Sequence, residues 1–74
     1  MLYMVQIDAE DPETFQANLL TEVLDQFEPK HTRSVLKAWR VLRFDRGRTP
    51  VLGQKRVFFW DESEAEWQSY REGD

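Results

Sequence analysis

The sequence predicts a small α+β domain in which a strand, two helices, a β-hairpin and a third helix follow one another. Three observations favour this order. The chain opens with an apolar, β-prone segment at residues 2–7, and apolar residues then recur at three- and four-residue steps over residues 12–27. Aromatic and β-branched residues fill positions 57–60, which is typical of a strand. The 74 residues are expected to form one domain, residues 1–74.

The first strand is expected over residues 2–7, an apolar run that stops at an aspartate. Asp11 followed by Pro12 then favours a helix start, because an aspartate side chain caps free amides and proline fits the first helical position. The helix is predicted over residues 12–27, with one apolar face toward the core. Expected core residues are Phe15, Leu19, Val23 and Trp39.

Residues 33–44 fit two structures. As a helix, at about 100° per residue, their basic side chains gather on one side, opposite Val35, Ala38 and Trp39. As a strand, they place Lys37 on the same face as Trp39, which is a poor alternation of apolar and polar residues. The helix is the preferred interpretation. The strand would instead give the order β-α-β-β-α, close to a ferredoxin-like sheet.

The last third of the chain predicts a turn, a hairpin and a helix. Residues 45–50 combine Asp, Gly, Thr and Pro and favour a loop, in which Gly47 can end the preceding helix from the left-handed region. Residues 51–60 are expected to form a β-hairpin. Asp61 and Glu64 have the spacing of a helix cap and its reciprocal partner, so a short C-terminal helix is predicted after them.

The chain offers little for catalysis or metal binding. It has no cysteine, one histidine (His31) and three scattered glycines, so it lacks a zinc ligand set, a phosphate-binding loop and a nucleophile elbow. The acidic triplet Asp8, Glu10 and Asp11 is expected to be a solvated loop and helix cap. We therefore expect no enzymatic activity, no metal and no cofactor. No apolar stretch is long enough to span a membrane, and the absence of cysteine fits the cytoplasm.

Charge is sorted into blocks along the chain. Residues 1–28 hold seven acids and no base, residues 29–56 hold nine bases and one acid, and residues 57–74 hold six acids and one base. The basic block, with aromatic residues among its cations, predicts a nucleic-acid-binding surface. Its candidate residues are Arg33, Lys37, Arg40, Arg43, Arg46, Arg48, Lys55 and Arg56.

Residues 30–68 also resemble a family. The segments that match are Arg33-Ser34-Val35 with Trp39, Pro50-Val51, Gly53, and Phe58-Phe59 running into Asp61-Glu62-Ser63. In this layout the chain resembles winged-helix excisionases, and it is similar to small terminase subunits of phages. The resemblance implies a small DNA-binding regulatory protein of phage or mobile-element type, with a basic helix in the major groove of duplex DNA.

Two other interpretations of the charge blocks stay open. The acidic and basic surfaces can serve a protein-binding regulator that meets an acidic or bipolar partner, including a second copy in a homodimer. Alternatively, the acidic flanks can fold over the basic middle and neutralise it within one chain.

Overall fold

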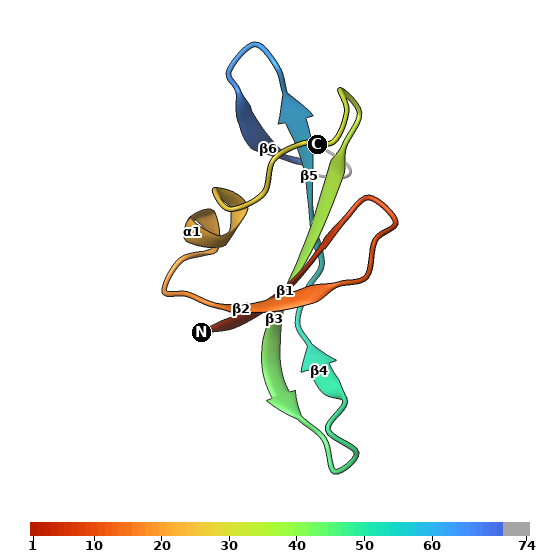
Figure 1. Cartoon of the computed structure of the whole chain (residues 1–74). Helices are drawn as coiled ribbons and strands as arrows, with labels where there is room; N and C mark the ends of the chain where they lie inside the picture. The colour runs from red at the N-terminus through yellow and green to blue at the C-terminus, as the bar shows by residue number, and fades with distance from the viewer. Residues whose placement is uncertain (71–74) are drawn as a thin grey trace.

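The computed structural model describes residues 1–70 and is built almost entirely from β-strands (Figure 1). Six strands and one short helix follow one another as β1 (Leu2–Ile7), β2 (Glu13–Gln16), α1 (Leu20–Leu24), β3 (Val35–Phe44), β4 (Pro50–Leu52), β5 (Arg56–Asp61) and β6 (Glu66–Tyr70).

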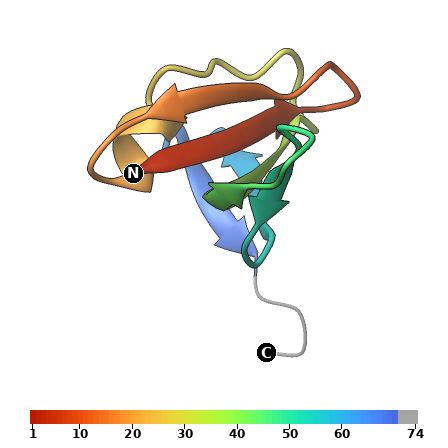
Figure 2. The same ribbon diagram turned by 90° about the horizontal axis from the view of Figure 1, so that it is seen from below.

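All paired strands are antiparallel, in the order β2-β1-β3-β5-β6, and β4 pairs with the far end of β3. Val5 of β1 lies opposite Ala38 of β3, and Leu36 of β3 lies opposite Phe58 of β5. The sheet is strongly twisted and curls round the side on which α1 lies (Figure 2). This leaves the other face of the sheet without a covering layer.

The core lies between α1 and one face of the sheet. Every second residue of β1 and β3 points to this face, because side chains alternate along a strand. The buried apolar side chains that form the core cluster are Tyr3, Val5, Ile7, Val23, Leu24, Leu36, Ala38 and Phe58.

Phe27, in the segment after α1, joins the two edges of the sheet. Its ring meets Phe15 of β2 edge to face, with centroids 5.3 Å apart. Its carbonyl oxygen accepts a hydrogen bond of 3.2 Å from the indole Nε1 of Trp67 in β6. The segment after α1 therefore contacts both edge strands of the sheet, β2 and β6.

A buried serine holds the loop before β3 in place through hydrogen bonds. Ser34 is fully buried, and its Oγ accepts hydrogen bonds from the backbone amides of Lys30 at 2.8 Å and His31 at 3.1 Å. The hydroxyl donates to Asp8 at 3.3 Å, whose carboxylate also accepts from the amide of Val35 at 3.0 Å. These contacts satisfy buried polar groups that would otherwise destabilise the fold.

The strand at residues 2–7 is confirmed, whereas the helix predicted over residues 12–27 is wrong. β2 occupies its first part, where Phe15 faces the core and its neighbours face solvent. The helix is confined to α1, and Leu19, expected in the core, is 61% exposed just before it. Pairing with β1 satisfies the backbone of residues 13–16, and this tertiary contact overrides the helical periodicity.

Residues 33–44 contain β3, so the preferred helix is wrong and the alternative strand is confirmed. The irregular alternation has a simple cause. Leu36 and Ala38 face the core, whereas Lys37 and Trp39 lie on the uncovered face of the sheet, where a charged residue is tolerated.

The predicted C-terminal helix is also wrong, because β6 occupies its place. Asp61 does act as a cap, but of the turn before β6: its Oδ1 accepts hydrogen bonds from the Ser63 hydroxyl at 2.7 Å and the Ser63 amide at 3.0 Å. Among residues 1–70, α1 is the only helix, so the predicted α+β winged-helix-like architecture is incorrect. The ferredoxin-like alternative also fails, because it requires a second helix.

Candidate nucleic-acid interface

The most prominent feature outside the core is a long hairpin that projects from the sheet (Figure 1). β4 and β5 follow each other along one edge of β3, interrupted at residues 53–55, where the amide of Gly53 still donates to the carbonyl of Arg40 at 2.9 Å. β1 pairs with β3 only as far as Arg40. Residues 41–52 therefore extend beyond the sheet, and we call them the arm. Strands were predicted in residues 51–60, but both pair with β3 rather than with each other.

The tip of the arm is closed by Asp45. Its backbone amide donates to the carbonyl of Thr49 at 3.0 Å, and its Oδ1 accepts from the amides of Gly47 at 3.0 Å and Thr49 at 2.9 Å. The amide of Arg48 donates to the Asp45 carbonyl at 3.0 Å. This is a three-residue hairpin loop that fixes the direction of the chain on both sides.

Arg48 holds an unusual backbone conformation in this loop. Its φ is 61°, in the left-handed region that glycine or asparagine normally occupies. The left-handed conformation was expected at Gly47, its neighbour. A bulky, charged residue at such a position strains the backbone, and strain of this kind gathers at functional sites. The strained backbone of Arg48 therefore makes it a candidate for a functional role in the arm.

The structure places the eight predicted basic residues at four locations. Arg43, Arg46 and Arg48 lie on the arm, and Arg40, Lys55 and Arg56 lie at its base. Lys37 lies on the uncovered face of the sheet, and Arg33 precedes β3 at the opposite end of that strand. The expected helical face made by Arg33, Lys37, Arg40 and Arg43 does not exist, because a strand spreads these positions over about 3.3 Å per residue.

None of these basic residues is neutralised within the described part of the chain. Within residues 1–70, ion-pair contacts join Lys30 to Glu10 and His31 to Asp8, and no others are present. The acid of the arm, Asp45, uses its carboxylate on backbone amides. Within residues 1–70, the acidic flank thus meets the basic block only where Glu10 pairs with Lys30 and Asp8 contacts His31, and it does not neutralise the eight candidate residues.

Apolar side chains accompany the cations. Leu42 and Phe44 are 57% and 52% exposed on the arm. At its base, a pocket of about 390 Å³ is bordered by Arg40, Arg56, Leu42 and Tyr3. The sequence alone does not predict this pocket, because the pocket depends on the register that brings Arg56 opposite Ala38, next to Arg40. An anion with a planar or apolar part fits such a surface better than a bare ion does.

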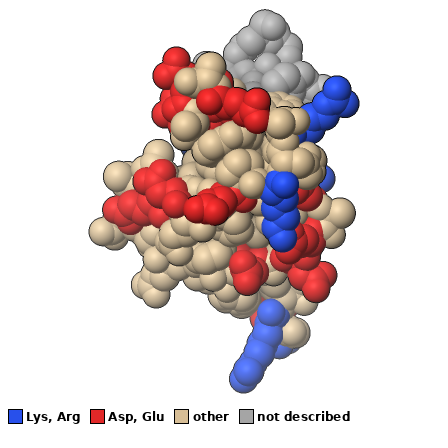
Figure 3. Space-filling model, turned by 45° about the horizontal axis from the view of Figure 1, so that its top comes forward, with Lys and Arg blue, Asp and Glu red and all other residues tan. Residues whose placement is uncertain are grey.

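The surface view shows how charge is distributed. Lys and Arg side chains project at the lower end of the molecule in Figure 3, and others lie in its middle and upper part among the Asp and Glu side chains. The segregation seen along the sequence therefore persists in space only in part, at the lower end.

One cluster elsewhere has the residue types of a catalytic triad but not the arrangement. Nε2 of His31 lies 3.6 Å from Asp8, and Ser34 also bonds to that aspartate. The Ser34 hydroxyl is fully buried and donates to Asp8, while its oxygen accepts from two backbone amides. A nucleophile must instead donate to its base and be open to substrate. The role of this cluster is structural, because its hydrogen bonds hold the loop before β3 in place.

The described residues also bear on the expectations about metal ions and membranes. Among residues 1–70, no three His, Cys, Asp or Glu side chains are grouped so that they could hold a metal ion, and this includes the acidic triplet near β1. No helix in the same range is long and apolar enough to cross a membrane. No known protein family matches the chain, and neither the characterised proteins nor the solved structures include a match.

Proposed function

We propose that the protein is a small accessory protein that binds duplex DNA through the arm and its base. The main support for this proposal is that six cations surround one projecting hairpin, and that none of them forms an ion pair with an acid in residues 1–70. Uncompensated Lys and Arg side chains on a projecting surface attract phosphates. The regulatory role expected from the sequence is compatible with such binding.

The shape of the arm supports this proposal. The major groove of B-DNA admits a two-stranded β-ribbon, and several DNA-binding proteins place strands in a groove. In this mode, Arg46 and Arg48 at the tip meet phosphates or base edges, while Arg40 and Arg56 at the base contact the flanking backbone. This replaces the basic helix expected at residues 33–44, because those residues form β3.

Charge reversal at two positions of the arm tests the proposal. Arg46→Glu combined with Arg48→Glu should weaken binding to a random-sequence duplex by at least about tenfold at low salt, since two phosphate contacts become repulsive. The matched control is Arg33→Glu with Lys37→Glu, which changes the net charge equally at predicted residues outside the arm. Fluorescence anisotropy measures both affinities, and circular dichroism checks that each variant is folded.

Two results would count against the proposal. The first is a wild-type protein that does not bind duplex DNA at low salt. The second is equal weakening by the two double variants, because binding would then follow net charge rather than the arm.

A further inference from the structure

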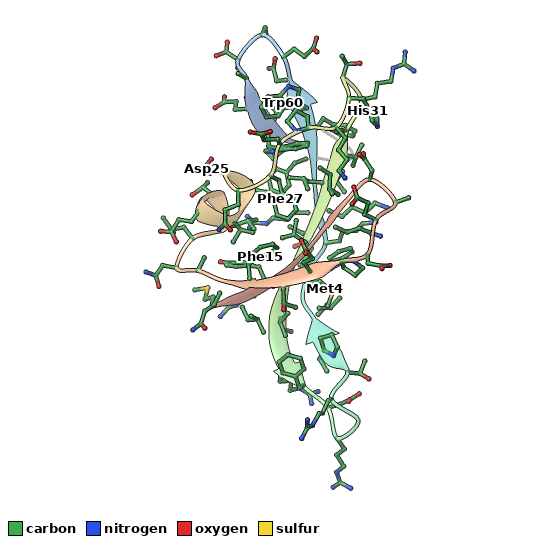
Figure 4. All side chains as sticks on the ribbon, in the orientation of Figure 1. Met4, Phe15, Asp25, Phe27, His31 and Trp60 are labelled. Atoms are coloured by element: carbon green, nitrogen blue, oxygen red, sulfur yellow. The ribbon has the colours of Figure 1, made fainter. Side chains whose placement is uncertain are left out.

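A second pocket lies at the opposite end of the molecule from the arm. It has a volume of about 290 Å³ and lies between α1 and the β5–β6 hairpin. Figure 4 labels three of its lining residues, Trp60, Phe27 and Asp25, which come from β5, from the segment after α1 and from the end of α1. The indole rings of Trp60 and Trp67 meet edge to face, with centroids 5.2 Å apart.

Carboxylates surround these aromatic rings. Asp25, Glu28 and Glu66 line the same pocket, and all three are exposed. None of them is in an ion pair with a cation of residues 1–70, and no Lys or Arg lines the pocket. The Trp67 indole is held in place by its hydrogen bond to the Phe27 carbonyl. The pocket is therefore preformed, aromatic and negatively charged.

This combination selects one kind of ligand group. The face of an indole attracts a cation, most often arginine, and carboxylates bind its guanidinium by charge-assisted hydrogen bonds. Arginine is also more weakly hydrated than lysine, so it loses less on entering a partly apolar pocket. The chemistry of the pocket fits an arginine side chain presented from a protruding segment.

The same chain presents such arginines. Arg46 and Arg48 lie at the tip of the arm, and neither has a partner carboxylate within residues 1–70. They cannot reach the pocket of their own chain, because the arm and the β5–β6 end lie at opposite ends of a molecule that is 44 Å long (Figure 1). We propose that the pocket receives an arginine from the arm of a second copy, in a head-to-tail contact.

Such a contact has defined consequences. It is heterologous, so each copy keeps one free arm and one free pocket, and association continues into open chains rather than stopping at a symmetric dimer. It also engages the arm that we propose for DNA binding, so the two contacts compete for one surface. Its charges make it sensitive to salt.

Complementary variants test the contact. Arg46→Glu/Arg48→Glu keeps the pocket and reverses the arm, whereas Asp25→Lys/Glu28→Lys keeps the arm and reverses the pocket. Each variant alone should be monomeric in sedimentation velocity, and their mixture should associate, because the native arm of one variant meets the native pocket of the other. In ¹⁵N-labelled arm-reversed protein, the indole N–H signals of Trp60 and Trp67 should shift on addition of the pocket-reversed variant and return at high salt. Glu62→Lys/Glu64→Lys, at the same end of the molecule but outside the pocket, should still associate like the wild type.

Two outcomes would overturn the inference. One is a mixture that stays monomeric with unshifted indole signals. Another is a shift of those signals by N-acetyl-arginine amide but not by the pocket-reversed protein, which would assign the pocket to an arginine of another protein. The test is independent of the proposed function, because the pocket-reversed variant retains the arm and should bind duplex DNA at least as well as the wild type.

Discussion

Asp45 and Thr49 are joined by two hydrogen bonds across the tip of the arm. The amide of Asp45 donates to the Thr49 carbonyl at 3.0 Å, and the Asp45 carboxylate accepts from the Thr49 amide at 2.9 Å. An acid in the middle of a basic segment is at first sight unfavourable for binding a polyanion. Its contacts explain its presence, because it holds Arg46 and Arg48 in a fixed loop.

Two substitutions at Asp45 distinguish the effect of an ordered loop on DNA binding from the effect of the negative charge. Asp45→Asn and Asp45→Ala both remove the negative charge, but only asparagine keeps an oxygen that accepts from the loop amides. The alanine variant should lose about 1 kcal/mol of the free energy of unfolding, as at other capping positions. It should also bind duplex DNA more weakly than the asparagine variant. Equal affinities would show that the shape of the loop does not contribute.

Replacing Arg48 by glycine should stabilise the fold and weaken binding. The left-handed conformation costs a non-glycine residue about 1–2 kcal/mol, and the added flexibility of glycine in the unfolded chain offsets part of that gain. The matched control is Arg46→Gly, which removes the same charge where φ is not positive and should destabilise the protein. Urea unfolding compares the two variants, and a less stable Arg48→Gly protein would contradict the argument.

Ser34 should be essential for the loop that precedes β3. Ser34→Ala removes the buried oxygen that accepts from the amides of Lys30 and His31, and these two partly buried donors are left without that partner. The expected loss is about 1–3 kcal/mol in the free energy of unfolding. Ser69→Ala, at an exposed serine, should change stability by less than about 0.5 kcal/mol. Urea denaturation of both variants measures the difference, and equal stabilities would exclude the fastening role.

The turn before β6 should respond to acid. Hydrogen bonds from the Ser63 hydroxyl and then from the Glu64 amide hold the pKa of Asp61 below its ordinary value of 3.8. A carboxyl group with a lowered pKa contributes stability above that ordinary value and loses it as the pH falls through the lower value in the folded protein. Ser63→Ala should raise the pKa of Asp61 toward 3.8 in an NMR titration. An unchanged titration would contradict the role of the hydroxyl.

The sequence predicts some elements well because their signals are local. The strand at residues 2–7 is apolar and stops at a charged residue, whereas Asp61, which was expected to cap a helix, accepts hydrogen bonds in a turn instead. The incorrect predictions arise where one local sequence pattern is compatible with two structures. An aspartate caps a hairpin turn as readily as a helix, and Phe15 and Leu19 are four residues apart although only one of them packs against the core.

The candidate site could also be predicted from the sequence only in part. Composition revealed the basic block, but the arrangement of its residues depends on strand register. Lys37 and Arg40 are close in sequence, yet one lies on the uncovered face and the other at the base of the arm. The left-handed conformation of Arg48 has no signal in a sequence in which Gly47 stands beside it.

The central claim, that the arm contacts DNA, is tested most directly by mapping the contact on the wild-type protein. A ¹⁵N-labelled sample titrated with a random-sequence duplex at low salt reports which backbone amides change. We expect the largest shifts within residues 40–56, and we expect them to diminish as salt rises, because binding releases counterions from the DNA. Shifts centred on residues 33–37, or no shifts at all at low salt, would contradict the account.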